Sequence, residues 1–92
     1  MILSRHHRED GFSKIKVGSY EHMLEQMNFL TEFMENKGEM FVNEIEKEGL
    51  IIREFATPED GLVESLIISE NLNTNPFYHK YISKFNTNQV DV

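Results

Sequence analysis

One stretch of this chain of 92 residues constrains the fold more than any other. From Tyr20 to Lys37 the apolar side chains recur at the three- and four-residue spacing of an amphipathic helix. At 100° per residue they cover an arc of about 120°, which is typical of a half-buried helix. Ser19 precedes the stretch as a suitable N-cap, and Gly38 follows it where left-handed backbone is favourable. The sequence therefore predicts a long helix with one buried face over residues 20–37.

The segments around this helix predict strands and a second helix. Residues 12–17 alternate polar and apolar side chains, which favours a short strand. Residues 39–69 hold β-branched and aromatic side chains between glycine-containing turns, which favours a meander of three strands. Asn75 and Pro76 are the residue types that open a helix, here one that reaches about residue 85. We therefore expect an α+β fold: strand, long helix, three-strand meander and short C-terminal helix.

A mostly helical fold is the alternative. Residues 39–48 also fit a helix, and a strand followed by two helices resembles the order of elements in ribbon–helix–helix repressors over about 37 residues. Under either interpretation we expect one globular domain over residues 12–85. Residues 1–11 are predicted to be a flexible polar arm and residues 86–92 a frayed tail, because neither shows a long apolar periodicity.

The composition excludes several classes of function. Without cysteine the chain has neither disulfides nor thiolate metal ligands. Its first residues lack the order of a signal peptide, and no apolar run can span a bilayer, so we expect a soluble cytoplasmic protein. It contains no Gly-x-Ser-x-Gly elbow and no glycine-rich phosphate loop. We therefore expect a protein that is not an enzyme, with no catalytic residues and no cofactor.

Two adjacent histidines are the strongest candidates for metal ligands. His6 and His7 are followed closely by Glu9 and Asp10. However, adjacent residues rarely converge on one ion, and no further ligand lies at helical spacing. We therefore expect no metal site.

The negative charge is concentrated in the middle of the chain. The net charge is −7, yet residues 19–70 hold thirteen carboxylates against three basic side chains, a net of −10. Residues 1–18 carry a net charge of +2 and residues 71–92 a net charge of +1. Such a distribution repels a nucleic-acid backbone from the middle and attracts a cationic surface.

The predicted helix gathers four of these carboxylates on one side. Their helical positions span about 80° along about four turns, with no lysine or arginine between them. They are Glu21, Glu25, Glu32 and Glu35, here called the acidic ridge. Like charges at this spacing cost a few tenths of a kcal/mol per pair. The ridge is either a solvated face or a surface that docks on a basic groove.

Two phenylalanines lie beside the acidic ridge and outside the apolar arc. Phe29 and Phe33 are four residues apart, so their rings are neighbours on the predicted helix. Such rings need cover, and a second layer of the same chain, such as the aromatic C-terminal helix, is the simplest cover. The other possible cover is a partner protein or a second copy of the chain.

Two classes of function follow from these patterns. The first is a small acidic macromolecule-binding protein, an inhibitor or regulator that docks the acidic ridge on a basic surface of a partner protein. By analogy, such proteins are common among phage and mobile-element genes that block host enzymes. The second is a dimeric DNA-binding regulator or antitoxin, in which Lys14 and Lys16 of a basic N-terminal strand contact DNA. The small positive charge of residues 1–18 argues against the second.

Overall fold

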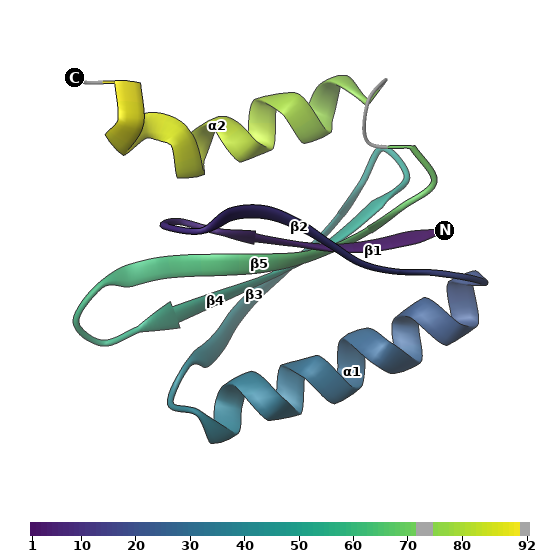
Figure 1. The fold of residues 1–92 in the computed structure, drawn as a ribbon, viewed down its shortest axis with the longest axis horizontal. Coiled ribbons are helices and arrows are strands. Elements are labelled where there is room, and N and C mark those ends of the chain that lie inside the picture. The colour runs from purple at the N-terminus through teal and green to yellow at the C-terminus, as the bar shows by residue number, and fades with distance from the viewer. Residues whose placement is uncertain (72–74, 91–92) are drawn as a thin grey trace.

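Five antiparallel strands form one sheet, and a helix covers each face (Figure 1). The elements are β1 (Ile2–His7), β2 (Gly11–Val17), α1 (Tyr20–Asn36), β3 (Met40–Lys47), β4 (Leu50–Thr57), β5 (Gly61–Ser69) and α2 (Pro76–Val90). The computed structural model describes residues 1–71 and 75–90, and the side chains of all these except 84 and 86–90. The α+β fold is confirmed, and the mostly helical alternative is wrong because β3, β4 and β5 form a meander.

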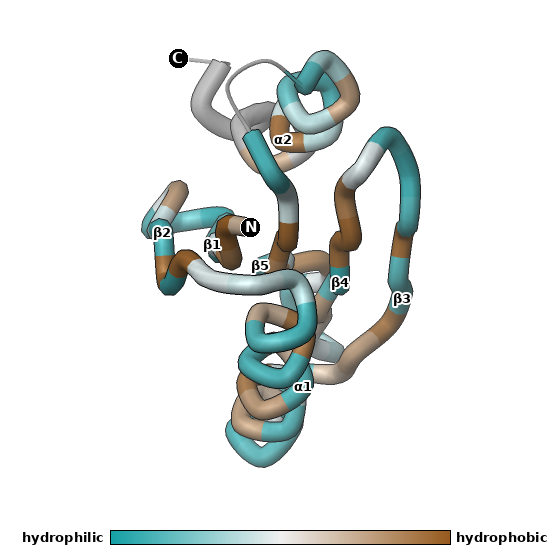
Figure 2. Tube along the Cα trace, turned by 90° about the vertical axis from the view of Figure 1, so that its right-hand side faces the viewer, coloured by the Kyte–Doolittle hydropathy of each residue, from teal (hydrophilic) through white to brown (hydrophobic). Residues whose placement is uncertain are grey.

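The strand order is β2-β1-β5-β4-β3, so the chain must cross the whole sheet between β2 and β3. α1 makes this crossing on one face of the sheet. α2 follows β5 and packs on the opposite face. Figure 2 separates the three layers, with α2 above the sheet and α1 below it. Because the sheet lies between the two helices, neither helix covers the solvent-facing side of the other.

α1 forms where the apolar spacing predicts it, and local hydrogen bonds fix both ends. The Ser19 Oγ accepts the backbone N–H of His22 at 3.2 Å, which satisfies a free donor of the first turn. Gly38 has φ of +101°, and the N–H groups of Gly38 and Glu39 donate to the carbonyls of Glu35 and Met34, both at 3.1 Å. This pair of bonds is a Schellman motif, and it sets the direction in which Glu39 leaves the helix.

The prediction of a flexible polar arm over residues 1–11 is wrong. β1 lies second in the sheet, paired with β2 on one side and with β5 on the other. Leu3 is 0% exposed, because α1 covers one face of β1. His6 is buried on the other face, where its ring stacks on Phe12 and lies against Phe85. The charged residues of this segment suggest a solvated arm, although it forms a strand that is covered by a helix on each face.

The other predicted elements differ from the structure mainly at the C-terminal end. β2 covers the strand predicted at 12–17, and β3, β4 and β5 cover the meander predicted at 39–69. α2 packs on the sheet rather than on α1. It continues to Val90, so residues 86–90 of the predicted tail are helical, whereas residues 91–92 lie outside the described residues.

The sheet separates two apolar cores of different composition. The core under α1 contains three methionines of the helix and aliphatic side chains from β1, β4 and β5, together with Phe55. The core under α2 contains Tyr78, Tyr81 and Phe85 packed on aliphatic side chains of β4 and β5. The hydroxyl of Tyr81 donates to Glu54 Oε2 at 2.7 Å, so the buried carboxylate of β4 has a partner.

Candidate partner-binding surface on α1

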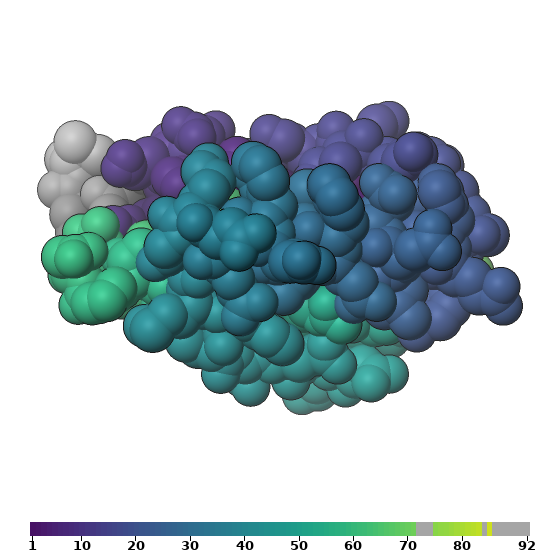
Figure 3. Space-filling model, turned by 90° about the horizontal axis from the view of Figure 1, so that it is seen from below, coloured from purple at the N-terminus to yellow at the C-terminus, as the bar shows by residue number. Residues whose placement is uncertain are grey.

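The acidic ridge lies on the side of α1 that faces away from the sheet. Met23, Met27 and Met34 pack against the sheet, so the opposite side of the helix points into solvent. All four ridge carboxylates are exposed: Glu21, Glu25, Glu32 and Glu35. Figure 3 looks at the molecule from the side on which α1 lies. The structure thus brings together the four residues that the sequence predicted as one ridge.

No basic side chain balances the ridge within the part of the chain that the structure describes. None of its four carboxylates forms an ion pair with a lysine or arginine there. Glu35 lies near the negative end of the helix dipole, where the last turn of α1 has no basic residue although Lys37 is the C-cap. Such a placement costs about 0.3–1 kcal/mol in an exposed helix. Helix stability therefore does not explain why these side chains are acidic.

One flank of the ridge is tied to the sheet. Arg53 of β4 donates from Nη1 to Asn28 Oδ1 at 2.7 Å and to Thr31 Oγ1 at 3.1 Å. Its Nε donates to Glu44 of β3, also at 2.7 Å. This network holds α1 at a fixed rotation over β3 and β4, so the opposite flank is the one open to a partner.

Phe29 and Phe33 lie on the open flank. The expectation that the C-terminal helix covers them is wrong, because α2 packs on the other face of the sheet. Phe29 is 65% exposed and Phe33 is 49% exposed. The ammonium of Lys37 lies 5.2 Å from the centre of the Phe33 ring, at the distance of a cation–π contact. The two rings are therefore the most prominent apolar side chains next to the acidic ridge.

Two hollows adjoin along this flank. The smaller, here called the dent, has a volume of about 160 Å³ and is lined by Phe29, Glu32, Phe33 and Asn36. The larger, here called the groove, has a volume of about 370 Å³ between α1 and strands β1, β2 and β5. It is lined by Arg5, His7, Ile15, Leu30, Phe33, Met34, Lys37, Glu39 and Glu64. Because Phe33 lines both, the dent opens beside the groove.

Two carboxyl groups and an arginine meet in the groove. Glu64 of β5 is 2% exposed and accepts a hydrogen bond from Arg5 Nε of β1. The carboxyl groups of Glu39 and Glu64 are also hydrogen-bonded to each other. Burial, the hydrogen bond to Glu64 and repulsion from Glu64 raise the pKa of Glu39 to about 7, against the opposing charges of Arg5 and Lys37.

The partner carboxyl shifts in the opposite direction. Burial opposes the ionisation of Glu64, but the hydrogen bond from Glu39 and the contact with Arg5 outweigh it and lower its pKa. The pair therefore shares one proton near neutral pH, held on Glu39 and donated to Glu64. The sequence analysis missed this cluster, and its one local signal is Glu64, the single charged side chain of strand β5.

The two adjacent histidines do not form a common site. His6 is buried under α2, and burial lowers its pKa, so its ring is neutral at pH 7. His7 lies on the other face of β1, where its Nδ1 accepts the backbone N–H groups of Glu9 and Asp10 at 3.1 and 3.3 Å. Within the described residues, no group of three or more His, Asp or Glu side chains is placed to hold a metal ion.

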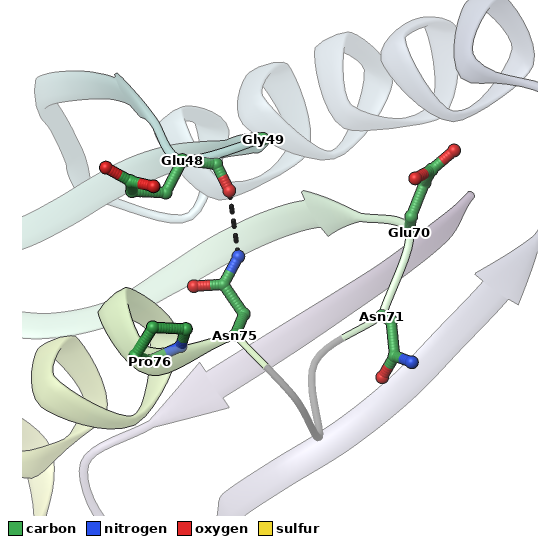
Figure 4. A pocket seen from close by; sticks show the side chains of 6 residues that line it. All are labelled: Glu48, Gly49, Glu70, Asn71, Asn75 and Pro76. Atoms are coloured by element: carbon green, nitrogen blue, oxygen red, sulfur yellow. Dashed lines mark hydrogen bonds between the residues drawn. The ribbon is translucent and has the colours of Figure 1, made fainter.

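A further depression lies between the β3–β4 turn and the start of α2 (Figure 4). Its lining residues are Glu48, Gly49, Glu70, Asn71, Asn75 and Pro76. Asn75 donates from Nδ2 to the Glu48 carbonyl at 2.8 Å, and its Oδ1 accepts the backbone N–H of Tyr78 at 3.0 Å. Asn75 thus caps α2 and joins it to the turn, which is a structural role rather than a binding one.

Comparison with known proteins adds no homologue. No protein-family model matches this chain, and no curated protein or solved structure is significantly similar to it. Neither helix in the described part of the chain is long and apolar enough to cross a membrane.

Proposed function

We propose that this protein binds a partner protein by docking the exposed side of α1 on a basic surface, and thereby inhibits or regulates that partner. The observation that carries the proposal is the position of four exposed carboxylates, which form no ion pair among the described residues, beside two exposed phenylalanines on one helix. On binding, the exposed phenylalanine pair would become a buried apolar anchor, and the charged ridge beside it would attract a cationic surface.

The shape of α1 fits a helix-in-groove mode of binding. Its 17 residues make a rod about 25 Å long at 1.5 Å per residue. Amphipathic helices of this kind insert anchor side chains spaced three or four residues apart into a groove of the partner. Phe29 and Phe33 have this spacing, and the acidic ridge runs parallel to them. The partner groove is expected to be basic along one wall.

The charges disfavour two other occupants of this side of the helix. A two-fold dimer through α1 would bring the acidic ridges of both copies together, which costs free energy through repulsion. A nucleic acid would bring its phosphates against the same carboxylates. Both arguments favour a partner protein with a cationic surface.

The alternative of a DNA-binding regulator has weaker support. Lys16 pairs across β1 with Leu3, whereas Lys14 pairs with Ser4, and neighbouring residues of β1 point to opposite faces. The two lysines therefore project to opposite faces of the sheet, on either side of the bulge at Ile15. They do not form one basic surface that could lie along a DNA backbone.

The proposal is tested by identifying the partner and then reversing the charge of the ridge. The partner is captured from the source cell, identified by mass spectrometry and used in surface plasmon resonance. The double variant Glu25→Lys and Glu32→Lys should weaken binding at least about tenfold, which is about 1.4 kcal/mol, mainly through a slower on-rate. Raising the salt concentration should slow association of the native chain in the same way.

A matched control makes the same change in net charge at positions outside α1. Glu9→Lys and Glu59→Lys reverse two exposed carboxylates in the β1–β2 and β4–β5 turns. This control should bind within about twofold of the native chain. If the ridge reversal binds as tightly as the control, the acidic ridge is only a solvated face and the proposal is wrong.

A further inference from the structure

We infer that the dent between Phe29 and Phe33 accepts the guanidinium of an arginine from the partner. The inference rests on the proposed function and names the side chain that the docking side of α1 recognises. Its evidence is the residues that line the dent: two aromatic rings, one carboxylate and one amide.

All four lining residues belong to one helix, so its backbone fixes their relative positions. Phe29, Glu32, Phe33 and Asn36 occupy positions i, i+3, i+4 and i+7, which lie on one side of α1 within an arc of about 100°. The backbone hydrogen bonds of the helix hold these positions at fixed spacing. A ligand that enters the dent therefore pays for ordering side chains only.

The size of the dent limits what can enter. Its volume of about 160 Å³ equals that of about five water molecules at about 30 Å³ each. This leaves room for one guanidinium and the end of its alkyl stem, and no room for a loop or a helix. The part of a partner that enters the dent itself is thus a single side chain.

The chemistry of the lining selects a planar cation. An apolar side chain would bury the Glu32 carboxylate without a partner, which costs free energy. A cation pairs with this carboxylate and lies over the ring faces of Phe29 and Phe33. Phe33 already makes a cation–π contact within the chain, with the Lys37 ammonium 5.2 Å from the centre of its ring.

Arginine fits better than lysine for two physical reasons. The guanidinium is flat and weakly hydrated, so it stacks on aromatic rings and also presents two parallel N–H groups to a carboxylate. The lysine ammonium is a compact, strongly hydrated charge that makes neither a stacked nor a bidentate contact. The ridge would attract both side chains, whereas the dent would discriminate between them.

Two synthetic peptides separate the dent from the ridge. Each has twelve residues in the same Gly/Ser frame, with four arginines in one and four lysines in the other. Titrations at low salt are followed by amide shifts in heteronuclear NMR. We expect the arginine peptide to bind at least about fivefold more tightly, with the largest shifts at Phe29, Glu32, Phe33 and Asn36.

The control variant removes the rings and keeps the charge. Because both phenylalanines are largely exposed, Phe29→Leu with Phe33→Leu should fold as the native chain does, which amide dispersion checks. In this variant the two peptides should bind equally, through the ridge alone. A second variant, Glu32→Gln, should also lose most of the preference for arginine.

The outcomes distinguish this inference from the proposed function. If the native chain binds both peptides equally, with shifts along the ridge, the arginine site is wrong and the acidic docking surface stands. If neither peptide binds, the arginine site is wrong and an acidic docking surface is disfavoured as well. If the same residues shift with protein concentration in the absence of peptide, a second copy occupies the dent and the inference is overturned.

Discussion

The variant Glu39→Gln should make the protein more stable at alkaline pH than the native chain. Glu39 and Glu64 share a proton because they lie together beside Arg5, and the pKa of Glu39 is about 7 instead of 4.5. The folded chain therefore holds a proton that the unfolded chain releases between these two values. The stability from this proton is fully present below pH 4.5 and is lost as the pH rises through 7. A glutamine amide donates to Glu64 at every pH.

The size of the effect follows from the shift in pKa. A change from 4.5 to about 7 corresponds to at most about 3.4 kcal/mol, at 1.36 kcal/mol per unit. Glu39 is only partly buried, so solvent screening reduces this to about 1–2 kcal/mol. A difference of this size in the free energy of unfolding moves the urea midpoint by about 0.5–1 M.

Urea unfolding, followed by circular dichroism between pH 5.5 and 8.5, measures this difference. The native chain should lose stability toward pH 8.5 relative to Glu39→Gln, and the two curves should converge toward pH 5.5. The burial of neutral His6 acts in the opposite direction below pH 6.5, but it is common to both chains and cancels in the difference. Glu59→Gln, an exposed carboxylate in the β4–β5 turn, is the matched control. Parallel curves for the native chain and Glu39→Gln would refute the reasoning.

Two further predictions concern the groove and the phenylalanine pair. Arg5→Met should lower the free energy of unfolding by about 3–5 kcal/mol at pH 8, because it leaves the buried Glu64 carboxylate without its cation. The loss in thermal or urea unfolding should be smaller at pH 5, where Glu64 can take up a proton, and an equal loss at both pH values would contradict the assignment. Phe29→Ala should change the free energy of unfolding by no more than about 0.5 kcal/mol, whereas the buried control Phe55→Ala should cost about 3–5 kcal/mol. With the partner identified, Phe29→Ala should raise the dissociation rate about tenfold.

The parts of the fold that local sequence determines could be predicted. The length of α1 follows from its apolar spacing, its N-cap serine and the Schellman glycine, which all act within a few residues. The exposed ridge follows from helical geometry once the buried methionines are known. The composition of residues 39–69 favoured strands and indicated the meander.

β1 was missed because its identity as a strand depends on distant partners. Its six residues include three charged or imidazole side chains, and their cover comes from β5, α1 and α2. One local signal was present. The tripeptide Glu-Asp-Gly occurs at residues 9–11 and again at 59–61, and each glycine ends a hairpin turn with positive φ, at +80° and +72°. The second tripeptide lies in a segment that predicts a turn between strands, and the first is the matching local signal for the β1–β2 turn.

The candidate site shows the same division between local and distant information. The angular positions of Glu25 and Glu32 on α1 were predictable, because they depend on the helix alone. The exposure of Phe29 was not, because it depends on which face of the sheet receives α2. The cluster of Arg5, Glu39 and Glu64 joins three segments that are far apart in the chain, and only the strand order brings them together.

The place of β1 in the sheet also sets the order in which the chain can fold during synthesis. β1 is the first strand to be made, yet one of its two neighbours is β5, the last strand. The contact between Arg5 and Glu64 joins residues 59 positions apart. At about 5–20 residues per second, the ribosome needs several seconds to make the segment between them. Until residue 69 has emerged, β1 has only β2 to pair with, and a lone two-stranded hairpin is marginally stable in water. The native sheet therefore closes late, in one long-range step that joins the β1–β2 hairpin to the β3–β4–β5 meander. Such high-separation pairing slows folding relative to a helical protein of the same length.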